Sequence, residues 1–297
     1  MFVDVQGCLK FHRSMSLSMI VFVAVLFSAA LHAGWNLLIK LSPNNEFAMG
    51  AVVFGHVPYA LIGLLIFPLP VMESWPFIIA GAGVHVGYQF FLGKAYKIGN
   101  YSQIYPIARG IAPMIIAVFS VVFLDFSLTI LNGSTILIIC LGVISLGASS
   151  IKINNKSEFK PILFALITGV FIATYSLIDG VGALKAGTAL GFYSWLALFN
   201  AFLMYALVAF QKRKRPAFRA YIQVPIFWIG GLASFSAFAI SIWAFTQAPI
   251  ALVSALRESS IIFAMIFGYF FLKEKSSPST YFSISIIFVG LVISRLA

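Results

Sequence analysis

The chain has 297 residues, of which 61% are hydrophobic and only 9% are charged. A soluble domain carries about 25% charged residues, so this composition excludes an ordinary water-soluble protein and indicates one that crosses a membrane repeatedly. The net charge of +11 does not indicate nucleic-acid binding. The basic residues cluster in short loops such as Lys212–Arg215, and no basic soluble domain exists to carry that function.

Ten apolar segments reach the length of about 20 residues that a membrane-spanning helix needs. Their connections are short, and the polar strip Ile153–Glu158 separates the fifth segment from the sixth. Residues 1–16 are expected to be an N-terminal leader, and 17–150 and 160–295 two repeats of five helices. The ten predicted spans are 17–39, 47–70, 75–93, 102–124, 130–150, 160–178, 188–210, 224–246, 249–272 and 279–295.

Two arginines lie deep inside apolar segments at matching places in the two halves. Shifting the second half back by 148 residues places Arg257 on Arg109 and Gly290 on Gly142. A charge at membrane depth costs roughly 2.5–3.5 kcal/mol on insertion scales, so a cation kept twice suggests a paired site for something negative. Five helices per half also means that the second half enters the membrane from the opposite side. The predicted fold class is an all-α membrane protein of ten transmembrane helices arranged as two inverted five-helix repeats.

The two arginines are expected near the middle of the membrane. At 1.5 Å per residue, each lies about 11–12 Å from the start of its helix, and inverted repeats typically enclose a site at that depth. The guanidinium fork matches a phosphate or carboxylate. The alternative is an internal salt bridge for each arginine. Glu258 is adjacent to Arg257, but neighbouring residues on a helix do not face each other.

Polar residues at helical spacing supply further candidates for the site. Tyr105 shares a helix face with Arg109, where it would either contact the substrate or cover the arginine's stem. His32 and Asn36 lie four residues apart in the first span. They are expected either to line a cavity or to form hydrogen bonds between helices.

Two more pairs repeat this spacing. His85 and Gln89 lie in the third span and are candidates for the cavity lining. Tyr175 and Asp179 lie near the end of the sixth, where Asp179 would take a proton for coupling, meet a substrate ammonium, or simply be a solvated charge at a helix end.

Helix breakers surround the first arginine. Pro106, Gly110 and Pro113 lie close to Arg109, and proline removes a helical hydrogen bond and kinks the helix. A kink there would act as a hinge. Span 249–272 has no internal proline, so the hinging is expected to be asymmetric.

Other chemistry finds little support in the sequence. Cys8 and Cys140 lack any metal-binding spacing, and neither the His-Glu-x-x-His pattern nor a Gly-x-Ser-Gly-like nucleophile occurs. We expect no metal, no cofactor and no enzyme activity. Most lysines and arginines lie in loops 1, 3, 5, 7 and 9, which by the positive-inside rule places those loops in the cytoplasm and both termini outside.

Several segments carry a family resemblance: LHAGWNLLIK in the first span, AYKIGNYSQIYPIARGIAP at the entry to the fourth, and WAFTQAPIALVSALRESSIIFAMIFGYFFLKEK through the eighth and ninth. With these, the chain resembles the drug/metabolite transporter superfamily, specifically the EamA-like branch. The segment ATYSLIDGVGA is similar to a subgroup associated with phosphonate use. The chain departs from the family pattern at Asp125, where a Gly-Glu pair is common.

The resemblance implies a multi-pass transporter of the cell (inner) membrane. Related sugar-phosphate carriers hold phosphate with basic residues on spans 4 and 9, the spans of Arg109 and Arg257. Family members are usually drawn with cytosolic termini, which the charge count contradicts, so both orientations stay open.

We therefore expect a secondary transporter that moves a small anionic or zwitterionic metabolite by alternating access, with the anion held between Arg109 and Arg257. The alternative is a flippase for a lipid-linked substrate or a broad exporter of amphiphiles and drugs. The expected partners are the substrate and the lipid bilayer, and both a monomer and a homodimer are compatible with the sequence.

Overall fold

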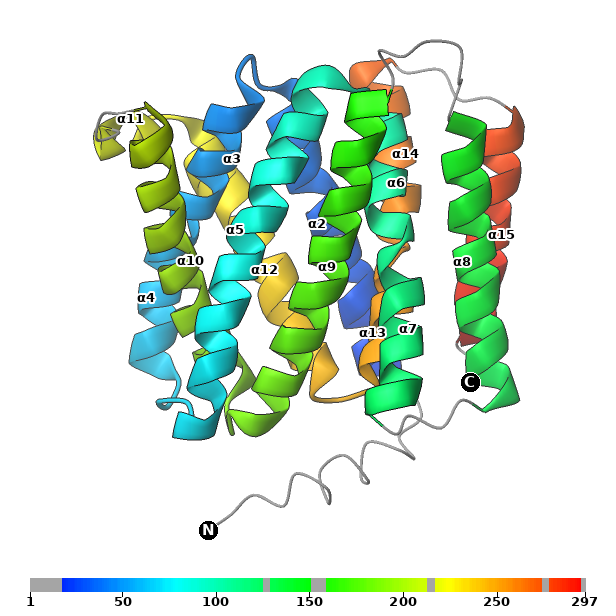
Figure 1. Ribbon diagram of the computed structural model, residues 1–297, viewed down its shortest axis with the longest axis horizontal. Coiled ribbons are helices and arrows are strands. Elements are labelled where there is room, and N and C mark those ends of the chain that lie inside the picture. The colour runs from blue at the N-terminus through cyan, green and yellow to red at the C-terminus, as the bar shows by residue number, and fades with distance from the viewer. Residues whose placement is uncertain (1–17, 125–128, 151–158, 213–216, 274–277, 295–297) are drawn as a thin grey trace.

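The computed structural model describes residues 18–124, 129–150, 159–212, 217–273 and 278–294, and these form a bundle of helices without strands (Figure 1). The predicted leader 1–16, Asp125 and the strip Ile153–Glu158 lie outside the described residues. The expected all-α architecture is confirmed for the described part of the chain.

Helix boundaries follow the loops that the sequence indicates. The first half contains α2 (Met19–Leu41), α3 (Asn45–Phe54), α4 (His56–Ile66), the short 3₁₀ helix η2 (Met72–Ser74), α5 (Trp75–Ile98), α6 (Tyr101–Gly110), α7 (Ala112–Phe123) and α8 (Ile130–Ser150). The second half contains α9 (Phe159–Lys185), α10 (Ala189–Lys212), α11 (Phe218–Ile222), α12 (Pro225–Phe245), α13 (Ile250–Arg257), α14 (Ser260–Leu272) and α15 (Pro278–Ser294).

Eight helical segments are long and apolar enough to cross a membrane within the described residues. The helices α8 and α15 contribute shorter apolar stretches, Ile130–Leu146 and Pro278–Ile293. The chain is therefore a multi-pass membrane protein, while the full count of ten spans stays a prediction. In Figure 1 the ends joined by loops 1 and 3 lie at the top, and we call that end the odd-loop face.

The fourth and ninth predicted spans are both interrupted near their middle. The helix α6 ends at Gly110 and α7 begins at Ala112, whereas α13 ends at Arg257 and α14 begins at Ser260. Ala112 and Ser260 are themselves 148 residues apart, so the two interruptions match. The ninth span is thus interrupted without an internal proline, and the expectation of asymmetric hinging stays a prediction.

The outer helix pair α8 and α15 packs side by side through two small residues (Figure 1). A Cβ atom on Gly142 would lie 2.9 Å from the backbone nitrogen of Ile287, and one on Gly290 would lie 3.2 Å from that of Ile139. Positions 139 and 287, like 142 and 290, are 148 residues apart. Each helix therefore presents the same surface to the other, which is the reciprocity that a two-fold axis produces.

A second close approach joins α12 to the junction of α3 and α4. A Cβ atom on Gly231 would lie 2.7 Å from the Cα atom of Gly55, so the two backbones touch. Small residues allow this approach in membrane bundles, where van der Waals packing replaces the hydrophobic driving force.

Gly231→Ala is expected to destabilise the bundle by about 1–3 kcal/mol, because the new methyl group forces two backbones apart. Gly83, which has open space at its Cβ position, is the matched control. Gly83→Ala should leave thermal unfolding in detergent unchanged or raise its midpoint slightly, since alanine favours a helix by up to about 1 kcal/mol. Equal effects of the two substitutions would contradict this packing.

Candidate functional site

The two helix interruptions meet at Arg109. Its Nη2 atom donates to the backbone oxygen of Arg257 and to Oε1 of Glu258, both at 2.9 Å. All three side chains are buried. The break between α13 and α14 leaves carbonyl groups without helical partners, and the guanidinium of the first half covers one of them. Arg109 thus ties the middle of the fourth span to the middle of the ninth.

This contact matches the alternative that the sequence left open for Arg109, since that arginine does form a buried salt bridge. The carboxylate that was discounted as a partner for Arg257 faces Arg109 instead. Arg109 keeps two donors, Nε and Nη1, without a partner among the described residues, and Glu258 keeps one acceptor, Oε2. The pair is therefore only partly satisfied.

Arg257 is held by aromatic rings. Its guanidinium carbon lies 5.9 Å from the centroids of both Phe238 and Phe245, a distance at which a cation is attracted to a ring face. Tyr175 also lies close enough to interact with it electrostatically. The arginine therefore projects from the end of α13 against α12 and α9.

Phe238 lies at the centre of this aromatic wall. Its ring centroid is 5.5 Å from that of His32, 5.2 Å from that of His85 and 5.8 Å from that of Tyr175. The predicted candidates on α2, α5 and α9 thus surround one side chain of α12. Sequence reasoning missed Phe238, because one phenylalanine among 31 carries no distinguishing signal.

His32 and Tyr105 lie beside the arginines. Their ring centroids are 6.3 Å apart, and Trp35 lies edge-on to His32 at 5.1 Å. Both Nδ1 of His32 and Nε1 of Trp35 are buried without a partner among the described residues. An unpaired buried polar atom costs about 1–3 kcal/mol, so these atoms are candidates for contact with a ligand or water.

Asn36, in contrast, is already used by the fold. It donates to the backbone oxygen of His32 at 2.7 Å and accepts from the hydroxyl of Tyr96 at 2.9 Å. It therefore links α2 to α5, which is the interhelical role that the sequence allowed for it.

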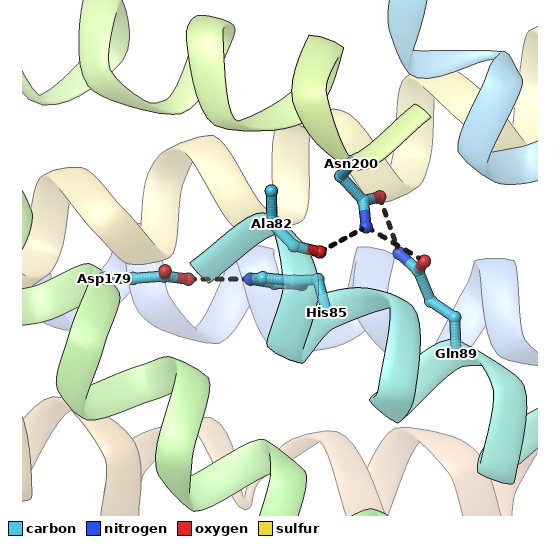
Figure 2. A network of polar contacts seen from close by, with 5 residues as sticks. All are labelled: Ala82, His85, Gln89, Asp179 and Asn200. Carbon is cyan, nitrogen blue, oxygen red and sulfur yellow. Dashed lines mark hydrogen bonds and ion pairs between the residues drawn. The ribbon is translucent and has the colours of Figure 1, made fainter. Parts of the chain in front are cut away.

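Asp179 and His85 form a second buried polar pair. Nε2 of His85 lies 2.7 Å from Oδ2 of Asp179 (Figure 2). The ring of Tyr175 stacks on that of His85 at 4.2 Å. Gly81 makes room for the carboxylate, because a Cβ atom there would lie 2.6 Å from Oδ1. The interpretation of Asp179 as a solvated helix-end charge is wrong, since its side chain is buried.

Gln89 lies one helical turn from His85 but pairs with a different helix. Gln89 Nε2 donates to Oδ1 of Asn200 at 2.9 Å, and Asn200 Nδ2 donates back to Gln89 Oε1 at 3.2 Å and to the backbone oxygen of Ala82 at 3.3 Å (Figure 2). The structure thus places Gln89 apart from the arginines. Asn200 was missed, although a lone asparagine inside the apolar run of α10 was a readable signal.

Glu258 is the other site residue that the sequence could have revealed, because it is a charged residue inside an apolar segment. Its matching position in the first half is Gly110, so the repeat brings a carboxylate to one side only. The buried centre then holds two arginines and two carboxylates, those of Glu258 and Asp179. Among the described residues, no group of three or more histidine, cysteine, aspartate or glutamate side chains could hold a metal ion.

Glu258→Gln is expected to destabilise the protein by about 3–5 kcal/mol, because it leaves the Arg109 charge buried without its carboxylate. Removing both charges, as Arg109→Met with Glu258→Leu, should recover much of that loss, since a well-packed apolar pair often replaces a buried ion pair at little cost. Thermal unfolding of the single and double variants measures this coupling. Additive losses would show that the two residues do not act as a pair.

Comparison with known proteins gives one family. Residues 159–296 match the model of the EamA-like transporter family, which supports placement in the drug/metabolite transporter superfamily and suggests transport of small solutes. No curated protein matches the chain.

One similar solved structure is described only as "Crystal structure of protein". It is 19% identical to this chain with a TM-score of 0.67, over 94% of this chain and 97% of that chain. At that identity the likeness concerns the fold alone, and it extends over both halves of the bundle.

Proposed function

We propose that the protein is a secondary transporter that carries a small zwitterionic or anionic metabolite across the cell membrane by alternating access. One observation carries the proposal: two buried arginines lie at matching interruptions of two membrane helices, and Arg109 keeps two donors there without a partner among the described residues. Interrupted helices that meet near the membrane midplane are where secondary transporters build their binding sites.

The charges of the site favour a ligand that carries both signs. The positive charges of Arg109 and Arg257 are offset by those of Glu258 and Asp179, so a dianion would bring excess negative charge into the membrane interior. A carboxylate or phosphonate would accept from Nε and Nη1 of Arg109 and approach Arg257. An ammonium would donate to Oε2 of Glu258, which lacks a partner among the described residues.

The reciprocal packing of α8 and α15 and the matched helix breaks support a two-fold relation between residues 17–150 and 160–295. Rocking of two such halves about the site would expose it to each side in turn. In this conformer the ends of α2 and α5 are fastened at the odd-loop face, because Nζ of Lys40 donates to the backbone oxygens of Tyr96 and Gly99 at 3.0 and 2.8 Å.

An apolar cleft supports the second candidate function, export of amphiphiles or movement of a lipid-linked substrate. The cleft, with a volume of about 640 Å³, lies between α2, α4, α10 and α12. Phe27 and Ile62 on its rim are more than half exposed, so it opens on the surface that faces lipid. A chain or ring attached to a polar group would fit there.

Ligand binding is expected to raise the thermal unfolding midpoint. A panel of amino acids, phosphonates, sugar phosphates and dicarboxylates tests the ligand class, since binding stabilises by about 2.7 kcal/mol at a hundredfold excess over Kd. Zwitterionic amino acids or aminophosphonates should give the largest shift. Arg257→Ala should abolish it, whereas Arg219→Ala, which removes an exposed arginine of α11, should not.

Two results would contradict the proposal. A shift that survives in both Arg109→Ala and Arg257→Ala would separate the ligand from the arginines. A shift with cationic or apolar amphiphiles alone would favour the apolar cleft and the exporter.

Lys40→Met is expected to release the odd-loop face. Two hydrogen bonds from a charged donor contribute about 1.5–3 kcal/mol each, so their loss should increase the open population about tenfold or more. Ser260→Cys, in a variant without Cys8 and Cys140, reports this as faster labelling by a membrane-impermeant thiol reagent, because Ser260 is buried. Lys97→Met removes only an exposed ion pair with Glu46 and should leave the labelling rate unchanged. Equal labelling rates in the two variants would show that Lys40 does not hold the odd-loop face closed.

A further inference from the structure

A row of polar groups lies along one face of α5. Ala82, His85 and Gln89 follow each other at intervals of three and four residues, so they line one face of the helix. The backbone of Ala82 and the amide of Gln89 both bind Asn200, and His85 binds Asp179 (Figure 2). This face therefore connects α5 to both α9 and α10.

This row of polar groups ends in a cleft at the odd-loop face. The cleft, with a volume of about 80 Å³, lies between α3, α5, α10 and α11, which are at the upper left of Figure 1. Gln89 lies in its lining, and Glu46 and Lys94 bring charges there. A cleft of this size has room for water, and these polar groups would bind it. Tyr221 of α11 also lines it, and burial raises the pKa of this tyrosine above its ordinary value, so its hydroxyl stays uncharged.

The geometry points to a proton-binding site at His85 and Asp179, reached from the odd-loop face through this cleft, with the amide pair Gln89–Asn200 as its gate. Both amides are buried, and neither titrates, so a proton does not pass while they stay paired. Separation of the pair would let water from the cleft reach the imidazole one helical turn away. The coupling of this proton to transport rests on the proposed function, whereas the binding itself does not.

Binding of one proton changes the charge of the His85–Asp179 pair. Opposite an ionised Asp179, Nε2 of His85 carries a hydrogen and donates it to Oδ2. Uptake of a proton from water at Nδ1 forms one N–H bond and leaves hydroxide in the cleft. The pair then passes from a net charge of −1 to zero. One O–H bond of the water is broken in this step, and no other bond is made or broken.

The neighbours of the pair determine what this change does. Tyr88 of α5, Tyr175 of α9 and Tyr193 of α10 are uncharged groups around it, His56 of α4 acts on it from a distance, and α12 contributes the apolar Phe238. The charged neighbour is Arg257 of α13, which interacts with Asp179.

Arg257 thus links the two sites. An unprotonated pair offers it a negative charge and competes with an anionic group of the substrate. Protonation removes that competition, so proton and substrate should bind together. By linkage, each should raise the affinity of the other by the same factor.

The binding site is tested without any substrate. The chain has four histidines, so ¹⁵N-histidine NMR of the full-length protein in lipid nanodiscs reports on four imidazole rings, each with two ring nitrogens. His85→Gln identifies the ring of interest. We expect the His85 signal to titrate with pH and to lose its titration in Asp179→Asn, where imidazolium has no counter-ion. His56, which packs against Tyr193 and Phe235, provides a comparison signal from the same sample.

If the amide pair Gln89–Asn200 is the gate, two substitutions of Gln89 should change hydrogen exchange at His85 in opposite directions. Gln89→Ala opens the floor of the cleft and should speed exchange of the His85 N–H with water about tenfold or more, whereas Gln89→Leu closes it with an apolar group and should slow exchange. Equal exchange rates in both variants would show that water does not reach His85 through this cleft. A His85 signal that stays constant while the protein remains folded would overturn the proton site itself.

The coupling is tested with the zwitterion that gives the largest thermal shift. Its affinity should rise as pH falls, approaching about tenfold per pH unit, the limit for one linked proton, and Asp179→Asn should abolish that dependence. Affinity independent of pH, or proton release on binding, would overturn the coupling while the proposed transport stands. If His85 titrates but the protein binds no compound of the panel, the proton site stands and the proposed transport function is contradicted.

Discussion

A cation inside a membrane must be neutralised by the protein itself, because no water is present to solvate it. Arg109 meets this constraint with two acceptors of the second half, the carboxylate of Glu258 and a carbonyl released where α13 ends. The constraint acts in both directions. The broken helix needs a donor for its carbonyl, and the buried arginine needs an acceptor, so the interruption and the arginine stabilise each other across the interface of the two halves.

The same interface carries a second pair, and Phe238 connects the two. Its ring lies between the guanidinium of Arg257 and the imidazole of His85, with Tyr175 against both it and His85. Rings of this kind transmit charge changes well, because they exclude water and keep the local dielectric constant low. A change in the charge of the His85–Asp179 pair would therefore act on Arg257 without movement of the backbone. The two buried pairs, Arg109–Glu258 and His85–Asp179, are therefore best regarded as electrostatically coupled.

The sequence predicted the helices and the positions of the arginines because both depend on strong local signals. Apolar length determines a membrane span, and an arginine inside such a span costs too much to be incidental. The partners were harder to predict. Glu258 faces Arg109 only because two interrupted helices from different halves meet, and the sequence considered Glu258 only as a neighbour of Arg257. Gln89 was grouped with the binding site by its spacing on α5, whereas its partner Asn200 lies on α10, and spacing within one helix says nothing about the facing helix.

The two halves share several positions at the 148-residue offset but differ in the chemistry of their buried centre. The interruptions, both arginines and the glycine contacts of α8 and α15 follow the 148-residue offset, yet Glu258 stands opposite Gly110 in that alignment. A fully symmetric pair of arginines would accept an anion equally well in two orientations related by the two-fold axis. A single carboxylate on one side removes that equivalence, since an ammonium group has a favourable place near Glu258 and none near Gly110. In the proposed transporter, the matched halves would supply two alternative openings, and the one asymmetric charge would give a zwitterion a single orientation between them.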